Sequence, residues 1–476
     1  MNNISSNSEK KLTVILTVVL SCVFLSLVWN NNVWMDEAFS ASLVNTDFAG
    51  VIKRSMADTL PPLYNIFLKL MTSVFGYTTY VMKITSVIPM ILTLILGAVT
   101  VRKRFGIKTA VLFMLSITFM PLVLYYGVEI RMYSLGFFFA TASGVYAYEV
   151  FSDPSKKNMA LFVIFSVLAG YSHHFAFITV AFAYLYLLLY YFFYDRKNIK
   201  IWFKCLGGTF VLYIPCLIVT LRQFSMVSGY FSMPDVDLKL FVQYMIYPYT
   251  VGITPVSVLC ILVMAAALIV FASGYITGKD RGCDSVFAIL CFSVYYGVLI
   301  FGTIISKIMS ANIFVDRYLF FSVGLLWLSA AILLTKNNKL FYAAVAAVVI
   351  IGVSEYVIEF KTEYGNSADE EILFLRENIK EGDIYYSIGG HEEMQNCIPF
   401  YTYLDAATPD LTFIHPLKEA VKTASDNKTT LWITVLDGYD PTDEESQVLR
   451  ENGLSMEKMA DFEFDRYRCE MYKVTR

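Results

Sequence analysis

Two adjacent carboxylates stand shortly after an apolar run near the start of the chain. The run LTVILTVVLSCVFLSLVW reads as a membrane helix, and Asp36 and Glu37 follow it within the stretch VWNNNVWMDEAFSASL. A carboxylate held at such a position can act as a general base toward a hydroxyl group. An acidic pair at a helix mouth is more often a solvated cap, so these two residues alone do not establish a function.

The other scarce ionisable side chains of the apolar region also lie at the ends of apolar runs. They are Asp58, Glu129, Arg131, His173, His174, Asp316 and Arg317. An ionisable group near hydrocarbon costs about 3 kcal/mol or more unless it is paired or lines a wet cavity, which makes each a functional candidate.

Each of these residues also has an ordinary structural interpretation. Glu129 and Arg131 could form a structural ion pair, and a histidine at an interface usually completes a hydrogen bond. Arg317 could hold lipid headgroups, while Tyr133 and Tyr318 could be interfacial belt residues. Their common position at one face of the membrane is the stronger signal.

The composition identifies the elements that must position these residues. Of the 476 residues, 57% are hydrophobic and 16% are charged, whereas a soluble domain carries about 25% charged residues. The charges form short islands between apolar runs of about 18 residues, the length that crosses a bilayer as a helix. The sequence therefore predicts a polytopic α-helical membrane protein. The net charge of −3 gives no indication of nucleic-acid binding.

The apolar runs predict about eleven spans. They cover residues 12–29, 80–101, 109–127, 132–150, 159–172, 175–194, 202–221, 254–277, 285–306, 318–335 and 340–358. The run 61–76 is too short to cross and contains Lys69. We expect it to form one of two interfacial helices in a first outer loop of about 30–79; the other contains Phe39, Leu43 and Val44.

This arrangement places the N-terminus and the short basic loops on one side. The basic residues are Lys10, Lys11, Arg102, Lys103, Arg104, Lys108, Lys156, Lys157, Arg196, Lys197, Lys200, Lys204, Lys279, Arg281, Lys336 and Lys339. Short loops rich in Lys and Arg are typical of the cytoplasmic side. The candidate residues then face outward, in a multi-pass protein of a plasma membrane, bacterial by its size and one-piece organisation.

The last part of the chain has the composition of a soluble domain. We expect a transmembrane domain over 1–360 and a small extracytoplasmic α/β domain over 365–476. Helical patterns at DEEILFLRENIKEGD and PTDEESQVLRENG alternate with strand patterns at IYYSI, LTFI, TLWITVL and YRCEMYKV.

The order of the motifs resembles a known family. WMDEA, ADTLPPLY, EIRMYSL, YSHHFAF and DRYL are similar in order and spacing to the polyprenyl-phosphate-sugar-dependent glycosyltransferases of the C superfamily. The nearest branches are the bacterial protein O-mannosyltransferase-like and aminoarabinose transferase-like enzymes. The resemblance covers most of 12–335 and fades in the C-terminal domain.

The resemblance implies a multi-span enzyme whose active site faces away from the cytosol. It implies that Asp36 and Glu37 are the family's acidic pair, with Asp36 as the base, and that Glu129, Arg131 and Tyr133 match its Glu-x-Arg-x-Tyr motif. Asp58 to Pro62 match its Asp-x-His-Pro-Pro motif, except that Leu60 replaces the histidine. The neighbouring pair His173 and His174 could compensate for that missing side chain.

We therefore predict a membrane glycosyltransferase that moves a monosaccharide from a polyprenyl-phosphate donor to an extracytoplasmic acceptor, with inversion. The acceptor is a cell-surface polymer, lipid or protein, and membrane lipids surround the site. Asp36 and Glu37 are the predicted catalytic residues. The predicted substrate-binding residues are Asp58, Glu129, Arg131, Tyr133, His173, His174, Arg317 and Tyr318. The sequence leaves the cofactor open, including a divalent cation near Glu129.

Two other classes of function are weighed against this one. A lipid or glycolipid transporter or flippase would also need many spans, but transporters often show internal repeats and charges near the midplane. We find no convincing repeat, and no Walker or GxGxxG motif offers a cradle for a soluble nucleotide donor. A sensor or scaffold whose C-terminal domain carries the activity is the third class.

Overall fold

The computed structural model divides the chain into two compact units. It describes residues 2–227, 236–249, 255–278, 282–308, 313–365, 368–389, 411–436, 438–463 and 468–476, and residues 398, 401, 404 and 409. The first unit contains Met1–Ser26, Phe48–Phe67 and Ile84–Glu359. The second contains Leu27–Asp47, Leu68–Lys83 and Phe360–Arg476. The second unit thus includes parts of the predicted outer loop, and the predicted boundary at 360–365 stays a prediction.

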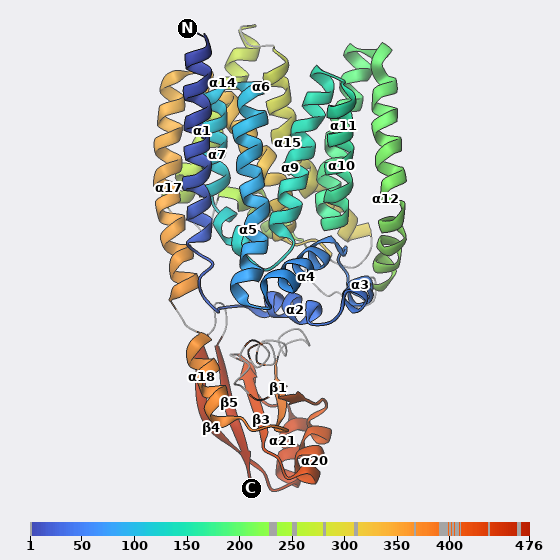
Figure 1. Cartoon of the computed structure of the whole chain (residues 1–476), viewed down its shortest axis with the longest axis vertical. Coiled ribbons are helices and arrows are strands. Elements are labelled where there is room, and N and C mark those ends of the chain that lie inside the picture. The colour runs from blue at the N-terminus through green and yellow to red at the C-terminus, as the bar shows by residue number, and fades with distance from the viewer. Residues whose placement is uncertain are drawn as a thin grey trace. The chain divides into compact units, whose positions relative to one another are not determined.

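Helices are found at all eleven predicted spans (Figure 1). They are α1 (Asn2–Leu25), α5 (Thr79–Leu96, continued by η1, Gly97–Val101, and α6, Arg102–Phe105), α7 (Ile107–Phe119, followed by α8, Val123–Val128), α9 (Tyr133–Ser152), α10 (Lys156–Ser172), α11 (His174–Tyr194), α12 (Ile199–Val227, preceded by η2, Arg196–Asn198), α14 (Pro255–Ile276), α15 (Cys283–Ile308), α16 (Phe320–Leu334, preceded by η4, Asp316–Leu319) and α17 (Asn338–Tyr364). Between α12 and α14 lie α13 (Leu238–Ile246) and η3 (Tyr247–Tyr249).

Seven helices in the described part of the chain are long and apolar enough to cross a membrane. They are α5 with its continuation, α11, α12, α14, α15, α16 with η4, and α17. The positions of the helices agree with the predicted spans, whereas the number of crossings stays a prediction.

Helix α16 forms the centre of the first unit, because every one of its residues is buried and it packs against α7, α9, α14 and α15. Glycines allow the close approach of α9 and α16. A Cβ atom at Gly136 would lie 2.5 Å from the Phe321 ring, and one at Gly324 would lie 2.1 Å from Thr141. Small residues at helix crossings are the usual means of close packing between membrane helices.

Three basic residues, Arg104, Lys108 and Lys336, lie at the end of this bundle where α7, α15 and α17 begin. Lys108 donates to Asn338, Lys336 donates to Ser285, and Arg104 lies 3.3 Å from Glu149 at the end of α9. These loops are the ones that the sequence predicts to be cytoplasmic. The starts of α9, α11 and α16 lie at the opposite end of the same helices.

The predicted outer loop forms three short helices rather than two. They are α2 (Met35–Val44), α3 (Phe48–Ala57) and α4 (Leu63–Phe75). The predicted apolar stripes fall on α2 and α4, whereas α3 was not expected.

The C-terminal part contains a five-stranded mixed sheet. Its strands are β1 (Ile384–Ile388), β2 (Thr412–Phe413), β3 (Leu431–Leu436), β4 (Ser455–Glu463) and β5 (Arg468–Thr475), in the order β2-β1-β3-β5-β4. β1 pairs in parallel with β2 and β3, while β5 is antiparallel to β3 and β4. Its helices are α18 (Ala368–Asn378), α20 (Leu417–Asn427) and α21 (Asp443–Glu451).

Helices cover both faces of this sheet, which explains why β1 and β3 are buried throughout. Leu417 and Val421 of α20 and Leu449 of α21 pack with Ile384 and Ile433 on one face. On the other face, Phe374 of α18 lies 6.0 Å from Trp432 and 5.4 Å from Phe462 between ring centroids. The predicted small α/β domain is confirmed.

Candidate active site

The turn between α8 and α9 buries two charged side chains. Glu129 ends α8, and the Arg131 N–H donates to its carbonyl oxygen at 2.6 Å. Glu129, Arg131 and Tyr133 are 3%, 8% and 1% exposed. Buried charge must be compensated by partners or by a ligand. The burial of Glu129 and Arg131 therefore makes this turn a candidate part of the site.

The two histidines stand where α10 ends and α11 begins. His173 is the N-cap of α11, and its Nδ1 atom accepts the Phe175 N–H at 3.0 Å. Because Nδ1 is an acceptor, the proton of the neutral ring lies on Nε2. Among the described residues, His173 Nε2 has no hydrogen-bond partner.

Electrostatics keep His173 in the neutral form. Burial lowers the pKa of His173 well below its usual value, and the charges of His174, Arg131 and Arg317 lower it further. The side chain is therefore a hydrogen-bond donor through Nε2 rather than a cation. The charges of Arg131 and Arg317 thus both act on the His173 ring.

The short helix η4 supplies the third motif. The Arg317 N–H donates to Asp316 Oδ1 at 2.7 Å, which fixes the turn before α16. The Tyr318 ring lies 4.7 Å from the His173 ring and 5.1 Å from the Phe175 ring. Asp316 to Tyr318 thus lie beside the histidine turn.

Phe321 joins these motifs to Tyr133. Its ring centroid lies 4.5 Å from that of His173 and 6.1 Å from that of Tyr133. The sequence motifs that contain Arg131, His173 and Arg317 are therefore brought together at one end of the bundle, as predicted from their common position at helix ends.

A cavity of about 370 Å³ opens beside His173 and His174. Its other polar lining residues are Thr59, Thr220 and Gln223. The remaining wall is apolar and consists of Leu60, Phe175, Phe177, Ile178, Tyr213, Leu217, Phe301, Ile305, Ile313 and Tyr318.

The Asp58 motif borders the same cavity. Gln223 Nε2 on α12 donates to the Leu60 carbonyl oxygen at 2.8 Å, and the Thr59 N–H donates to Asp58 Oδ1 at 2.6 Å. Leu60 therefore lines one cavity with His173 and His174. Compensation by the histidine pair for a histidine at position 60 stays a prediction.

Sequence reasoning missed a cluster of tyrosines around Asp316. Tyr126 and Tyr247 share a hydrogen bond between their hydroxyl groups, and the Tyr295 hydroxyl donates to the Tyr244 carbonyl oxygen at 2.6 Å. The charge of Asp316 acts on all four of these tyrosines. The run QYMIYPY, with tyrosines at 244, 247 and 249, is the signal that could have indicated the cluster.

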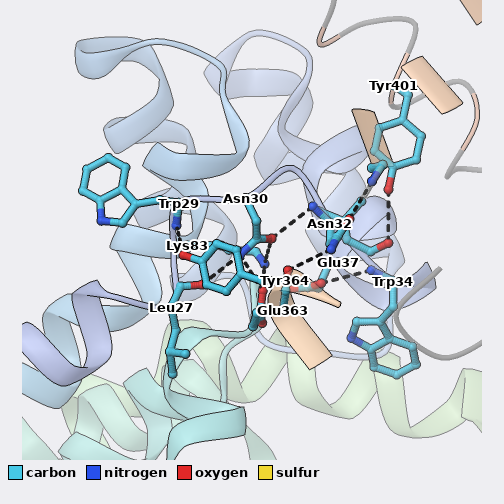
Figure 2. A network of polar contacts seen from close by, with 12 residues as sticks. Leu27, Trp29, Asn30, Asn32, Trp34, Glu37, Lys83, Glu363, Tyr364 and Tyr401 are labelled. Carbon is cyan, nitrogen blue, oxygen red and sulfur yellow. Dashed lines mark hydrogen bonds and ion pairs between the residues drawn. The ribbon is translucent and has the colours of Figure 1, made fainter. Parts of the chain in front are cut away.

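The acidic pair lies in the first turn of α2, in the second unit. Asp36 and Glu37 are 7% and 4% exposed. The Trp34 N–H donates to Glu37 Oε2 at 3.0 Å (Figure 2), so Glu37 caps the helix that carries Asp36. Negative charge is favourable at a helix N-terminus, and the capping role leaves Asp36 as the stronger candidate for the base.

No cluster of three or more His, Cys, Asp or Glu in the described part of the chain is arranged to hold a metal ion. The sequence left open whether a divalent cation is bound, and the described residues offer no candidate site for one.

Comparison with known proteins places the fold. No protein-family model matches the chain, and no curated protein matches it at a significant level. Its structure is similar to ArnT from Cupriavidus metallidurans in the apo state, with a TM-score of 0.64, 11% identity and 98% of each chain covered. ArnT bound to undecaprenyl phosphate matches with a TM-score of 0.63, 12% identity and 97% of each chain covered.

A third similar structure is the arabinofuranosyltransferase AftD from Mycobacteria. The TM-score is 0.51 at 12% identity, over 98% of this chain and 40% of that one. The chain therefore shares the fold of ArnT, and the predicted polytopic helical fold with a small C-terminal α/β domain is confirmed.

Proposed function

We propose that the chain is a membrane glycosyltransferase that transfers a monosaccharide from a polyprenyl-phosphate donor to an extracytoplasmic acceptor. The observation that carries the proposal is the cavity beside His173, which combines a long apolar wall with polar groups. An isoprenoid chain needs the apolar wall, and its phosphate needs hydrogen-bond donors and cations. That ArnT, a protein of the same fold, binds undecaprenyl phosphate supports the choice of ligand.

We assign the phosphate to Arg131, Arg317 and His173. Both guanidinium groups act on His173, and His173 Nε2–H is a donor without a protein partner in the described part of the chain. Fixed donors and cations of this kind stabilise the charge that develops on a leaving group. Tyr133, Tyr318 and His174 would complete the wall around the donor.

The transfer is a single in-line displacement. The acceptor hydroxyl oxygen forms a bond to the anomeric carbon while the bond between that carbon and the phosphate oxygen breaks. Asp36 takes the hydroxyl proton, and the polyprenyl phosphate leaves with the bonding electron pair. One displacement inverts the configuration at the anomeric carbon. Glu37 holds the first turn of α2, and Asp58 belongs to the acceptor side.

The orientation follows the positive-inside rule. The basic ends of α7, α15 and α17 would face the cytosol of a plasma membrane, with the N-terminus inside and the C-terminal domain outside. Transfer from the lipid-linked sugar to its acceptor would then take place outside the cell.

Replacement of Asp36 by Asn tests this function. We expect the purified Asp36→Asn variant to bind undecaprenyl phosphate like the wild type and to lose transfer by about 1,000-fold or more, because the hydroxyl group keeps its proton. Asp195→Asn, the same change at the basic end of the bundle, should leave both properties unchanged. Full transfer by Asp36→Asn, or a wild type that does not bind undecaprenyl phosphate, would contradict the proposal.

A further inference from the structure

A network of polar contacts, several of them buried, surrounds the loop that precedes α2 (Figure 2). Lys83, on α5, is 1% exposed and forms an ion pair with Glu363 at the end of α17. Asn30 lies between these two residues. It accepts from Lys83 Nζ at 2.8 Å and donates to Glu363 Oε2 at 2.8 Å. A buried ammonium group is tolerated only with such compensation.

Asn32 connects the loop to the residues that follow the last predicted span. Its Nδ2 atom donates to the Glu363 carbonyl oxygen at 2.8 Å, and its Oδ1 atom accepts the Ala368 N–H at 2.8 Å. Its own N–H donates to Asn30 Oδ1 at 3.1 Å. Because Asn32 is 7% exposed, water cannot easily replace these bonds.

Two further contacts continue the same connection along the loop. The Trp29 N–H donates to the Tyr364 hydroxyl at 3.1 Å, and the Tyr401 hydroxyl donates to the Val33 carbonyl oxygen at 3.5 Å. Most residues from 29 to 33 are therefore bonded to residues from the last part of the chain. Figure 2 shows these bonds converging on the loop from Glu363, Tyr364 and Tyr401.

The loop ends directly at the helix that carries the acidic pair. Trp34 follows Val33, and its N–H and carbonyl oxygen bond to Glu37 Oε2 and to the Ala38 N–H. The path of residues 30–33 therefore sets where α2 begins. Hydrogen bonds fix such a path more narrowly than apolar contacts, because they require a direction as well as a distance.

We propose that Asn30, Asn32, Lys83 and Glu363 form a clamp through which the C-terminal part of the chain positions Asp36. The four are positioning residues: they act through the loop and touch no reacting atom. The proposal rests on the proposed function only in giving Asp36 its role as the base. It assigns Glu363 and the backbone of Ala368 a role in transfer that does not involve binding the acceptor.

The test compares Asn32→Ala with Asn31→Ala in the purified full-length protein. Asn31 is the adjacent residue, and its bond to Asp369 is exposed, so Asn31→Ala controls for the truncation itself. We expect Asn32→Ala to raise amide hydrogen exchange in α2 by about 10-fold, with exchange in α20 unchanged. Transfer kcat should fall by about 10- to 100-fold, because small misplacements of a catalytic group are costly, while the affinity for undecaprenyl phosphate stays the same.

The isosteric variant Asn32→Asp keeps the measurement decisive if truncation prevents folding. It retains the acceptor for Ala368 and replaces the donor to the Glu363 carbonyl oxygen by a second acceptor, and we expect the same changes in exchange and kcat. Unchanged exchange in α2 in both variants would overturn the clamp, whatever the activity. Raised exchange in a protein whose wild type transfers no sugar would establish the clamp and overturn the proposed function, so the two failures are distinguishable.

Discussion

The imidazole ring of His173 stacks on the ring of Phe321, with 4.5 Å between the ring centroids and 30° between the planes. The Phe321 ring also occupies the space over Gly136, on α9. One phenyl ring of α16 therefore packs against α9 and against the turn before α11. The position of His173, the proposed hydrogen-bond donor to the phosphate, therefore depends on helix packing as well as on its hydrogen bond with the Phe175 N–H.

Replacement of His173 by Asn separates its two roles. Asn is a strong N-cap and can accept the Phe175 N–H, but it has no donor at the position of Nε2. We expect His173→Asn to keep the melting temperature and to lower the transfer rate by about 100-fold, the effect of removing one oxyanion donor. His173→Ala should also lose stability, by about 1 kcal/mol. Equal activity of His173→Asn and wild type would exclude the donor role.

The stability of the protein should depend on pH through His173. Burial first, then the charges of His174, Arg131 and Arg317, lower the pKa of His173 in the folded state, so below about pH 6.5 only the unfolded state binds this proton. Stability therefore falls as the pH drops, by up to about 1.4 kcal/mol per pH unit, and is independent of this group above about pH 7. We expect the melting temperature of His173→Asn to fall less steeply with decreasing pH than that of the wild type. Parallel plots of melting temperature against pH would be evidence that His173 is not neutral in the folded protein.

Gly136 tests the connection between helix packing and the site. A Cβ atom there would lie 2.5 Å from the Phe321 ring, so Gly136→Ala must displace a ring that contacts His173. We expect a loss of stability of about 1–3 kcal/mol, typical of overpacking, and weaker binding of undecaprenyl phosphate. Gly207→Ala on α12 is the matched control, because no atom lies within 4 Å of the added methyl group. Similar behaviour of the two variants would disprove the connection.

Arg317 should contribute to phosphate binding through its charge. Arg317→Gln keeps the hydrogen bond from the backbone N–H of residue 317 to Asp316 Oδ1 but removes the cation. We expect the affinity for undecaprenyl phosphate to fall by about 10- to 100-fold, in line with the loss of a charge-assisted hydrogen bond. Farnesol, which lacks the phosphate, should compete equally well in both proteins. If farnesol binding falls as much as phosphate binding, Arg317 holds the wall of the cavity instead.

Long apolar runs made the membrane helices predictable. All eleven runs coincide with helices, because a segment as apolar as α14 or α16 can satisfy its backbone in lipid only as a helix. The grouping of Arg131, His173 and Arg317 could be predicted from their common position at helix ends. Two of the elements that were missed are polar: α20 contains two lysines and Glu419 in its first six residues, and β4 is an edge strand with four charged residues.

Contacts between distant residues could not be predicted from the sequence. Lys83 reads as a lone charge near the start of a span, and only the fold brings it to Glu363, 280 residues later. The same holds for Asn32, one of three consecutive asparagines that look alike in the sequence. Periodicity describes which face of a helix is buried, but the identity of the partner depends on the tertiary arrangement.

Helix α12 forms one wall of the cavity with Tyr213, Leu217, Thr220 and Gln223. Its other side is a stripe of exposed apolar residues, namely Val211, Ile214, Ile218 and Leu221. In the described part of the chain, α12 thus has the cavity on one side and an exposed apolar face on the other, and Pro215 removes one backbone hydrogen bond in the middle of that helix. A long-chain ligand that approached through the bilayer would meet this helix, and a bend at Pro215 would admit it without a rearrangement of the buried centre around α16.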